Sequence, residues 1–263
     1  MLTNHNLKGE HPMLTDTFLL ELKQKYLDAF APYIQDPGFE KKSWELITKA
    51  GDVEVNTSRG DLFEKVCVSN ISATVTIPDR DWKSSIQWLG IQTFPSNPLV
   101  PMFMGVFEHV DEKGLEHHPA YFDIYPVIPI EEDKQYFQEV IGTVCKKYDR
   151  KYPDLPESYL EMFRLKEAGI GVGYGVGLSL MPDEKDHDYF MDVASAIREA
   201  YFEIVERRKN APYTQKQVEE VNEFRKLWVK FIFMDNRFFS GGVQLGVPPE
   251  SFMIHMLPPS VRF

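Results

Sequence analysis

The sequence predicts an α+β fold in which a large antiparallel sheet is sandwiched between helices. Short segments of alternating apolar and polar residues dominate the first half of the chain, as expected for strands with one buried face. Longer segments with helical spacing follow, and strand-like segments close the chain. Because strands and helices do not alternate one by one, this order favours an antiparallel sheet covered by helices over a βαβ architecture.

The predicted strands are rich in β-branched and aromatic residues and are separated by turn residues, such as those of 58–61 and 95–98. Short apolar runs near the C-terminus are interpreted as strands as well. In chain order, the expected strands are 53–57, 63–68, 71–77, 88–94, 100–109, 121–128, 228–234, 243–245 and 252–257.

The predicted helices carry apolar residues at positions i, i+3, i+4 and i+7, which is typical of one buried helix face. Thr15 and Thr214 are expected N-caps, because a threonine hydroxyl accepts a hydrogen bond from the first helical turn. Residues 1–13 are expected to form a loose tail and residues 14–263 a single domain. The expected helices are 15–30, 131–148, 158–168, 186–209 and 214–227.

Composition and charge exclude several classes of function. The 263-residue chain has a formal net charge of −11, which argues against binding nucleic acid or an anionic membrane surface. The two cysteines, Cys67 and Cys145, lie far apart without metal-binding spacing, so a reducing compartment with free thiols is expected. Neither a signal peptide nor a membrane span of about 18 apolar residues is found, and the protein is expected to be cytoplasmic.

A glycine-rich stretch and a pair of histidines resemble a dinucleotide-binding loop and a metal site, but neither assignment fits the sequence. The glycine-rich stretch 169–177 follows a predicted helix, whereas a dinucleotide-binding loop must follow a strand and open a helix. It is better interpreted as a strand with one face free of side chains. Among seven histidines, only His117 and His118 cluster with an acid, Asp123. Adjacent residues of a strand point to opposite faces, so no metal site is expected and the histidines are interpreted as surface or loop residues.

Asp123 and Arg237 are the charged residues that the pattern offers as site candidates. Asp123 lies in an otherwise apolar and aromatic segment, where desolvation would raise the pKa of its carboxyl as a general acid requires. The alternative is that Asp123 faces solvent or caps the turn at Pro126. Arg237 follows Asp235 and Asn236 after the expected strand 228–234 and could bind a carboxylate through paired hydrogen bonds; the alternative is a surface ion pair of little consequence.

Several short motifs together resemble the oxygen-dependent coproporphyrinogen III oxidase family. They occur in the family's order and at nearly its spacing, over about residues 15–263. The matching segments are 39–44 (F-x-x-x-S-W), 63–65 (the V-F-E-K strand), 97–101 (N-P-Y-V-P), 204–208 (I-V-E-R-R), 228–231 (Y-V-E-F), 242–244 (F-G-L-Q) and 250–262 (E-S-I-L-M-S-x-P-P-x-V-R). The resemblance implies a coproporphyrinogen oxidase-like sheet between helices, a homodimer, and a tetrapyrrole bound on the face of the sheet. It implies no metal or organic cofactor as clearly required.

The chain departs from this family at its functional residues. The family's H-A-N-V-R contains the proposed catalytic histidine and the substrate-binding asparagine and arginine, and this chain has 104–108, Met-Gly-Val-Phe-Glu, instead. The family's substrate-binding G-G-R is Gly246–Pro248 here. The aspartate of its W-D-R-G falls on Asn236, with the arginine kept as Arg237. The aspartate of its G-G-G-x-D-L-T-P is kept as Asp123.

The resemblance and its departures imply a tetrapyrrole-processing oxidoreductase with an altered substrate or reaction. Losing fixed cations argues against faithful decarboxylation of propionate side chains. Electrons would pass to O2 as co-substrate or come from an external donor, as in a bilin reductase-like reaction. The alternatives are a non-catalytic tetrapyrrole-binding protein and an enzyme for another aromatic substrate. The expected site comprises Asp123 as the catalytic acid, with Arg237, Asn236, Gln244, Ser69, Asn70 and Met104 as substrate-binding residues.

Overall fold

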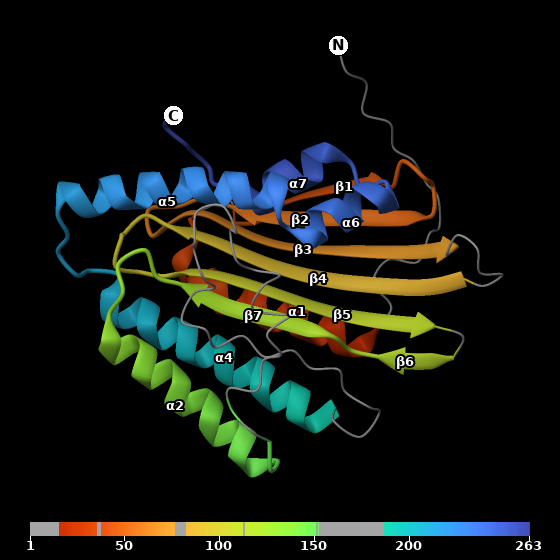
Figure 1. The fold of residues 1–263 in the computed structure, drawn as a ribbon, viewed down its shortest axis with the longest axis horizontal. Helices are drawn as coiled ribbons and strands as arrows, with labels where there is room; N and C mark the ends of the chain where they lie inside the picture. Colours follow the sequence, from red (N-terminus) through yellow and green to blue (C-terminus); the bar gives the residue numbers. More distant parts are fainter. Residues whose placement is uncertain (1–15, 36–37, 77–82, 113, 151, 153–186) are drawn as a thin grey trace.

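A seven-stranded antiparallel sheet organises the protein (Figure 1). The computed structural model describes residues 16–35, 38–76, 83–112, 114–150, 152 and 187–263. The strands follow the order β1-β2-β3-β4-β5-β6, and β7 pairs with β5 beside β6. Their bounds are β1 Glu40–Glu45, β2 Gly51–Ser58, β3 Phe63–Thr76, β4 Lys83–Pro95, β5 Met102–Glu112, β6 Leu115–His117 and β7 Ala120–Tyr125.

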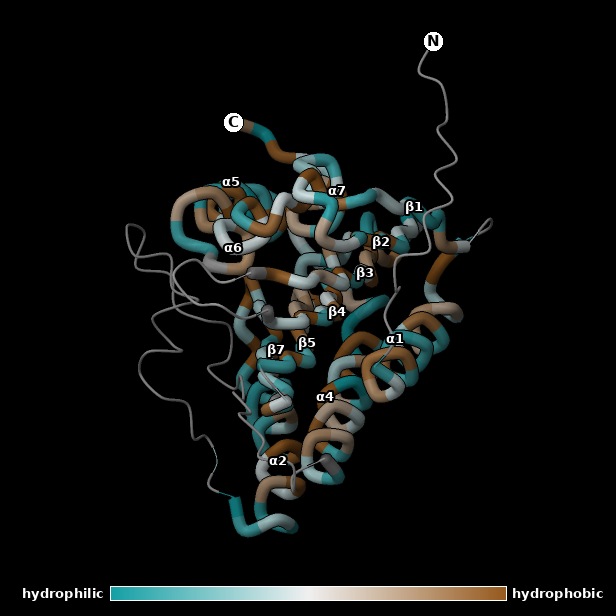
Figure 2. Tube along the Cα trace, turned by 90° about the vertical axis from the view of Figure 1, so that its right-hand side faces the viewer, coloured by the Kyte–Doolittle hydropathy of each residue, from teal (hydrophilic) through white to brown (hydrophobic). Residues whose placement is uncertain are grey.

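Helices cover both faces of this sheet, as Figures 1 and 2 show. One face carries α1 (Thr17–Phe30), which a short 3-10 turn follows (Ala31–Tyr33), together with α2 (Glu131–Lys147) and α4 (His187–Arg208). The other face carries α5 (Gln215–Met234), α6 (Arg237–Leu245) and α7 (Pro249–Met256). Within the described ranges, no helix combines the length and the hydropathy needed to cross a bilayer.

The sheet separates two hydrophobic cores because successive side chains of a strand point to opposite faces. On β7, Phe122 and Ile124 belong to the core beneath α1, α2 and α4, whereas Tyr121 and Tyr125 belong to the core beneath α5, α6 and α7. All six residues of β7 are buried, as expected for a strand covered on both faces. The predicted sandwich of a large antiparallel sheet between helices is confirmed.

The three C-terminal segments expected to be strands are helical. Residues 228–234 continue α5, residues 243–245 end α6, and residues 252–256 lie in α7. A short apolar run has the same composition in a buried strand and a buried helix, so periodicity alone does not separate the two. Within α5, Trp228, Phe231 and Ile232 recur at i, i+3 and i+4 on its buried face.

The helix boundaries largely follow the sequence pattern. Thr214 caps α5 in a capping box with Gln217, as predicted. Asp16 caps α1 by accepting a hydrogen bond from Leu19 N, where Thr15 was expected. The segments 63–68 and 71–77 form one continuous strand, β3, and β1 and β6 are strands that the sequence pattern did not indicate. The predicted helix 158–168 and glycine strand 169–177 lie outside the described residues.

Asn97 joins the turn after β4 to the end of α4. Its amide Nδ2 donates to the backbone oxygens of Arg208 at 3.1 Å, Lys209 at 3.3 Å and Ala211 at 2.9 Å. Its Oδ1 accepts from Leu99 N at 2.9 Å. The side chain is buried and supplies a donor to the backbone oxygens of Lys209 and Ala211, whereas Arg208 O also accepts from Ala211 N at 3.0 Å.

We predict that Asn97→Ala lowers the free energy of unfolding by about 2–3 kcal/mol, because buried carbonyl oxygens lose their donor. Urea unfolding followed by circular dichroism measures this effect. Asn210→Ala, at an exposed position two residues beyond α4, is the matched control and should change stability by less than about 0.5 kcal/mol. Equal effects of the two substitutions would contradict this role of Asn97.

Candidate functional site

A cavity of about 230 Å³ lies between the sheet and the helices α6 and α7. Its floor consists of side chains from β2, β3, β4 and β5 that point to the α5–α7 face, and its roof comes from α6 and α7. The polar or aromatic residues that line it are Ser69, Trp88, Glu108, Phe238, Ser251, Phe252 and His255. This mixture of apolar walls and few polar groups is typical of a small-molecule site.

Trp88 gives the cavity a flat aromatic wall. Its indole lies over Gly90, two residues further along β4, where an added Cβ would be 2.0 Å from the ring. Glycine at this position is therefore what permits the ring to lie along the sheet. The imidazole of His255 meets the indole edge to face at a centroid distance of 5.3 Å.

His255 is a buried, neutral histidine. Burial, together with the nearby charge of Lys65, lowers its pKa to about 3. Its Nδ1 is hydrogen-bonded to Ser69 Oγ at 2.8 Å. A serine–histidine pair can form a nucleophilic dyad, but such a low pKa makes His255 too weak a base to activate Ser69 near neutral pH. The pair instead offers polar groups that orient a ligand.

Glu108 is the acidic group of the cavity. Desolvation raises its pKa to about 7, so its carboxyl is partly protonated at neutral pH. A carboxyl in this state donates a hydrogen bond or a proton as well as accepting one. Lysine and arginine are absent from the described residues that line the cavity. An anionic substituent would therefore lack a fixed counter-charge here.

Asp123 lies on the same face of the sheet but does not line this cavity. Its side chain is fully buried in β7; its Oδ1 accepts from Ile124 N at 2.7 Å and its Oδ2 from the hydroxyl of Tyr121 at 3.4 Å. Tyr121 and Tyr125 are themselves hydrogen-bonded at 3.1 Å. Burial raises the pKa of both phenols well above the ordinary value, so they remain proton donors.

The register of β5 relates Asp123 to the cavity. Asp123 pairs with Met104, and Glu108 lies four residues further along the same strand. Four residues of a strand span about 13 Å, so the two carboxyls lie that far apart along one face.

The other predicted substrate-binding residues do not lie together. Ser69 lines the cavity, but Asn70 points to the opposite face, where its Oδ1 accepts from Lys23 Nζ at 2.8 Å. Met104 is buried beside Asp123.

The three predicted residues in or next to α6 also lie in different environments. Asn236 is the N-cap of α6, with its Oδ1 accepting from Phe239 N at 2.8 Å, so its side chain has a structural role. Arg237 opens the helix, and Gln244 is exposed on it outside the cavity lining. The strand that was expected to end at Arg237 is the helix α5, which ends at Met234.

Sequence reasoning did not select Glu108, Trp88 or His255 as site residues. His255 was interpreted as a surface or loop histidine, and it is buried in α7. The signal for Glu108 was its place in the segment that resembles H-A-N-V-R, where it replaces an arginine. For Trp88 and His255 the sequence has no such signal, because they meet only when α7 packs on the sheet.

Comparisons with known proteins support a common origin. A family profile described as coproporphyrinogen III oxidase matches residues 15–263. An oxygen-dependent coproporphyrinogen-III oxidase from Francisella philomiragia is 27% identical over 270 residues, which cover 92% of this chain and 88% of the relative. That of Francisella tularensis subsp. tularensis is 26% identical with the same coverage.

One solved structure has a similar fold. Phytochromobilin synthase from tomato, in complex with biliverdin, superposes with a TM-score of 0.50 at 10% identity. The match covers 81% of this chain and 71% of the synthase. This likeness concerns the fold.

Glu108 and His255 give the fold opposite pH dependences. The pKa of Glu108 is raised from 4.5 to about 7, so its contribution to stability is complete below pH 4.5 and is lost as pH rises to 7. The pKa of His255 is lowered from 6.5 to about 3, so its contribution is complete above pH 6.5 and is lost as pH falls. Between pH 4.5 and 6.5 the two effects oppose each other.

We predict that Glu108→Gln makes the protein more sensitive to acid. In the wild type, the stability that Glu108 contributes as pH falls offsets the stability that is lost at His255, and the variant lacks this contribution. From pH 7 to pH 5 the variant should lose about 1–2 kcal/mol more unfolding free energy than the wild type, a value reduced for the partial exposure of Glu108. Urea unfolding at pH 5, 6 and 7 measures the difference. Glu139→Gln, at an exposed position of α2, is the control. Parallel pH profiles of wild type and Glu108→Gln would refute the raised pKa.

Proposed function

The chain belongs to the coproporphyrinogen III oxidase family, and from that premise we propose that it is an oxidoreductase acting on a tetrapyrrole, with a substrate or reaction altered from that of its relatives. The cavity is the observation that carries this proposal. Glu108 and Val247 both line it, although 139 positions separate them in the sequence (247 − 108). The family resemblance aligns these two positions with H-A-N-V-R and G-G-R, the motifs that contact substrate in the family.

The lining of the cavity supports an altered specificity. Glu108 stands at the position of an arginine that would pair with a carboxylate, and at neutral pH its carboxyl is partly protonated. Such a group prefers a neutral acceptor, such as a carbonyl oxygen, over a propionate. We therefore propose that the end of the tetrapyrrole held here presents a neutral or apolar substituent.

The size of the cavity suits one part of a tetrapyrrole. Its volume of about 230 Å³ is below the roughly 300–1,000 Å³ usual for small-molecule sites. We propose that it encloses one end of the tetrapyrrole, against the flat wall of Trp88, and that the remainder extends along the sheet toward Asp123. Aromatic faces stack favourably on planar conjugated rings.

We propose Asp123 as the acid that donates a proton to a pyrrole or bridging carbon. Its position on the face of the sheet that carries the cavity, within hydrogen-bond reach of the Tyr121 hydroxyl, supports this role. O2 as the oxidant, or an external donor as the reductant, would supply the redox partner. Arg237 opens α6 near the cavity and is proposed to hold a propionate.

We predict that the purified full chain binds at least one of biliverdin, coproporphyrin III and coproporphyrinogen III, with quenching of tryptophan fluorescence. Trp88→Phe should remove most of the quenching, because its ring contacts the ligand, whereas Trp44→Phe on β1 should not. Asp123→Asn should keep the dissociation constant within about threefold and lower turnover by about 100-fold or more. Absorption spectroscopy follows the conversion.

The results separate this proposal from its alternatives. If no tetrapyrrole binds, both the enzyme and the non-catalytic binding protein are excluded. Tetrapyrrole binding with turnover that is unchanged in Asp123→Asn excludes the proposed acid. Binding without conversion, in the presence of either O2 or a reductant, favours the non-catalytic binding protein.

We also propose a cytoplasmic homodimer. Both cysteines, Cys67 and Cys145, are buried free thiols, which suits a reducing compartment. Large apolar side chains are exposed on the neighbouring helices α5, α6 and α7. These are Phe233 (49% exposed), Met234 (66%), Val243 (54%) and Met253 (58%). Exposed apolar groups gathered in this way are typical of a subunit interface.

We predict that the wild-type protein sediments at twice its 30.5 kDa chain mass and that Met234→Glu combined with Val243→Glu yields a folded monomer. Both side chains are exposed, so the charges disrupt the interface without disturbing the core. Sedimentation velocity measures the state. Leu115→Glu, at a 73% exposed position on β6, is the control and should remain dimeric. A monomeric wild type at micromolar concentration would exclude the dimer.

A further inference from the structure

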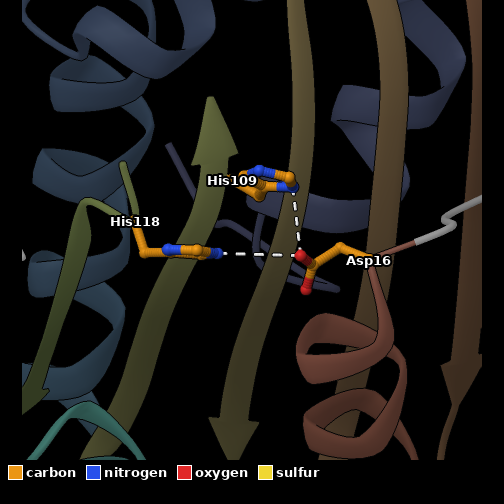
Figure 3. A group of neighbouring side chains, drawn as sticks. All are labelled: Asp16, His109 and His118. Atoms are coloured by element: carbon orange, nitrogen blue, oxygen red, sulfur yellow. Dashed lines mark ion pairs between the residues drawn. The ribbon is translucent and has the colours of Figure 1, made fainter. Parts of the chain in front are cut away.

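Three potential metal ligands meet on the face of the sheet opposite the cavity (Figure 3). Asp16 precedes α1, His109 lies on β5, and His118 lies between β6 and β7. Asp16 Oδ2 is 3.0 Å from His109 Nδ1 and 3.6 Å from His118 Nε2. One ligand atom from each of the three residues lies within 4.8 Å of the others.

The imidazole of His109 has unsatisfied hydrogen-bonding groups. Both ring nitrogens of His109 are buried, and neither has a hydrogen-bond partner among the described residues. Such groups carry a desolvation cost unless a partner compensates for it. The rings of His109 and His118 are stacked at a centroid distance of 4.7 Å, so both present their edges toward the carboxylate.

We propose that Asp16, His109 and His118 form a binding site for a divalent transition metal ion of the zinc class. Ligands about 2.1 Å from a tetrahedral zinc ion lie about 3.4 Å apart, and the measured distances of 3.0 and 3.6 Å lie on either side of this value. Two imidazoles and one carboxylate suit Zn²⁺, Co²⁺ or Fe²⁺. Mg²⁺ and Ca²⁺ prefer oxygen ligands throughout.

The surroundings hold the three ligands in place. Asp16 Oδ1 accepts from Leu19 N at 2.8 Å, and Asp16 N donates to Gln87 Oε1 at 2.8 Å, which leaves Oδ2 directed toward the two imidazoles (Figure 3). Glu116 Oε2 is 3.8 Å from His109 Nε2, on the side away from Asp16, as a carboxylate that orients a metal-bound histidine would be. The ring of Phe18 meets His118 edge to face.

The proposed ion has a structural role. It would join the start of α1 to β5 and to the connection between β6 and β7, which are far apart in the sequence. His109 and Glu108 are neighbours on β5 that point to opposite faces, so this site is separate from the cavity and does not depend on the proposed function. With three protein ligands, a water molecule would complete a tetrahedral shell.

Isothermal titration of the tag-free, metal-stripped full chain with Zn²⁺ tests the proposal. One ion should bind per chain, and a hundredfold excess over the dissociation constant should raise the melting temperature by roughly 5–10 °C. Asp16→Asn, His109→Gln and His118→Gln should each weaken binding at least tenfold. Asparagine caps a helix as well as aspartate does, so Asp16→Asn preserves α1 while removing the charged ligand.

Matched controls identify the site. Asp28→Asn, at an exposed position of α1, and the double variant His5→Gln/His11→Gln should bind Zn²⁺ as the wild type does. Circular dichroism verifies that each variant is folded. The proposal is overturned if the wild type does not bind Zn²⁺, if binding persists in the three site variants, or if the His5/His11 variant abolishes it. Direct contact between Asp16 and the two imidazoles is then the role of the cluster.

Discussion

The alternation of side chains across a sheet that is buried on both faces is the constraint on which the rest of the structure depends. Along β5, Met104, Val106 and Glu108 point toward α5–α7, while Phe103, Phe107 and His109 point toward α1, α2 and α4. A shift of the register by one residue would exchange these sets. The cavity would then lose its carboxyl and the opposite face would lose its histidine.

The sheet could be predicted because its strands alternate clearly and are bounded by turn residues. Val53, Val55 and Ile71 fall on the face that the pattern indicates, and the helices at 17–30 and 187–208 follow their apolar stripes. The C-terminal segments could not be assigned in this way. Their apolar runs are three to seven residues long, and only the packing of α5, α6 and α7 over the sheet decides that they are helical. Gly242 is part of that packing, since an added Cβ would be 2.1 Å from the ring of Phe252.

The site could be predicted only in part, for a related reason. The apolar segment around Asp123 indicated a shielded carboxyl, and the side chain is fully buried. Its distance from the cavity depends on the pairing of β7 with β5, which sequence patterns do not reveal. Asn70 and Asn236 were expected to bind substrate, yet one contacts Lys23 on the far face and the other caps a helix. His118 was grouped with His117 and Asp123, whereas the turns from β5 through β6 to β7 bring its ring against that of His109.

The central claim is that a tetrapyrrole occupies the α5–α7 face of the sheet, with one end in the cavity. A crystal structure of the full chain with a bound tetrapyrrole tests it most directly. We predict electron density for the tetrapyrrole against Trp88, beside Glu108 and His255 and extending toward Asp123. Density on the face covered by α1, α2 and α4, or at the outer surface of the helices, would contradict it.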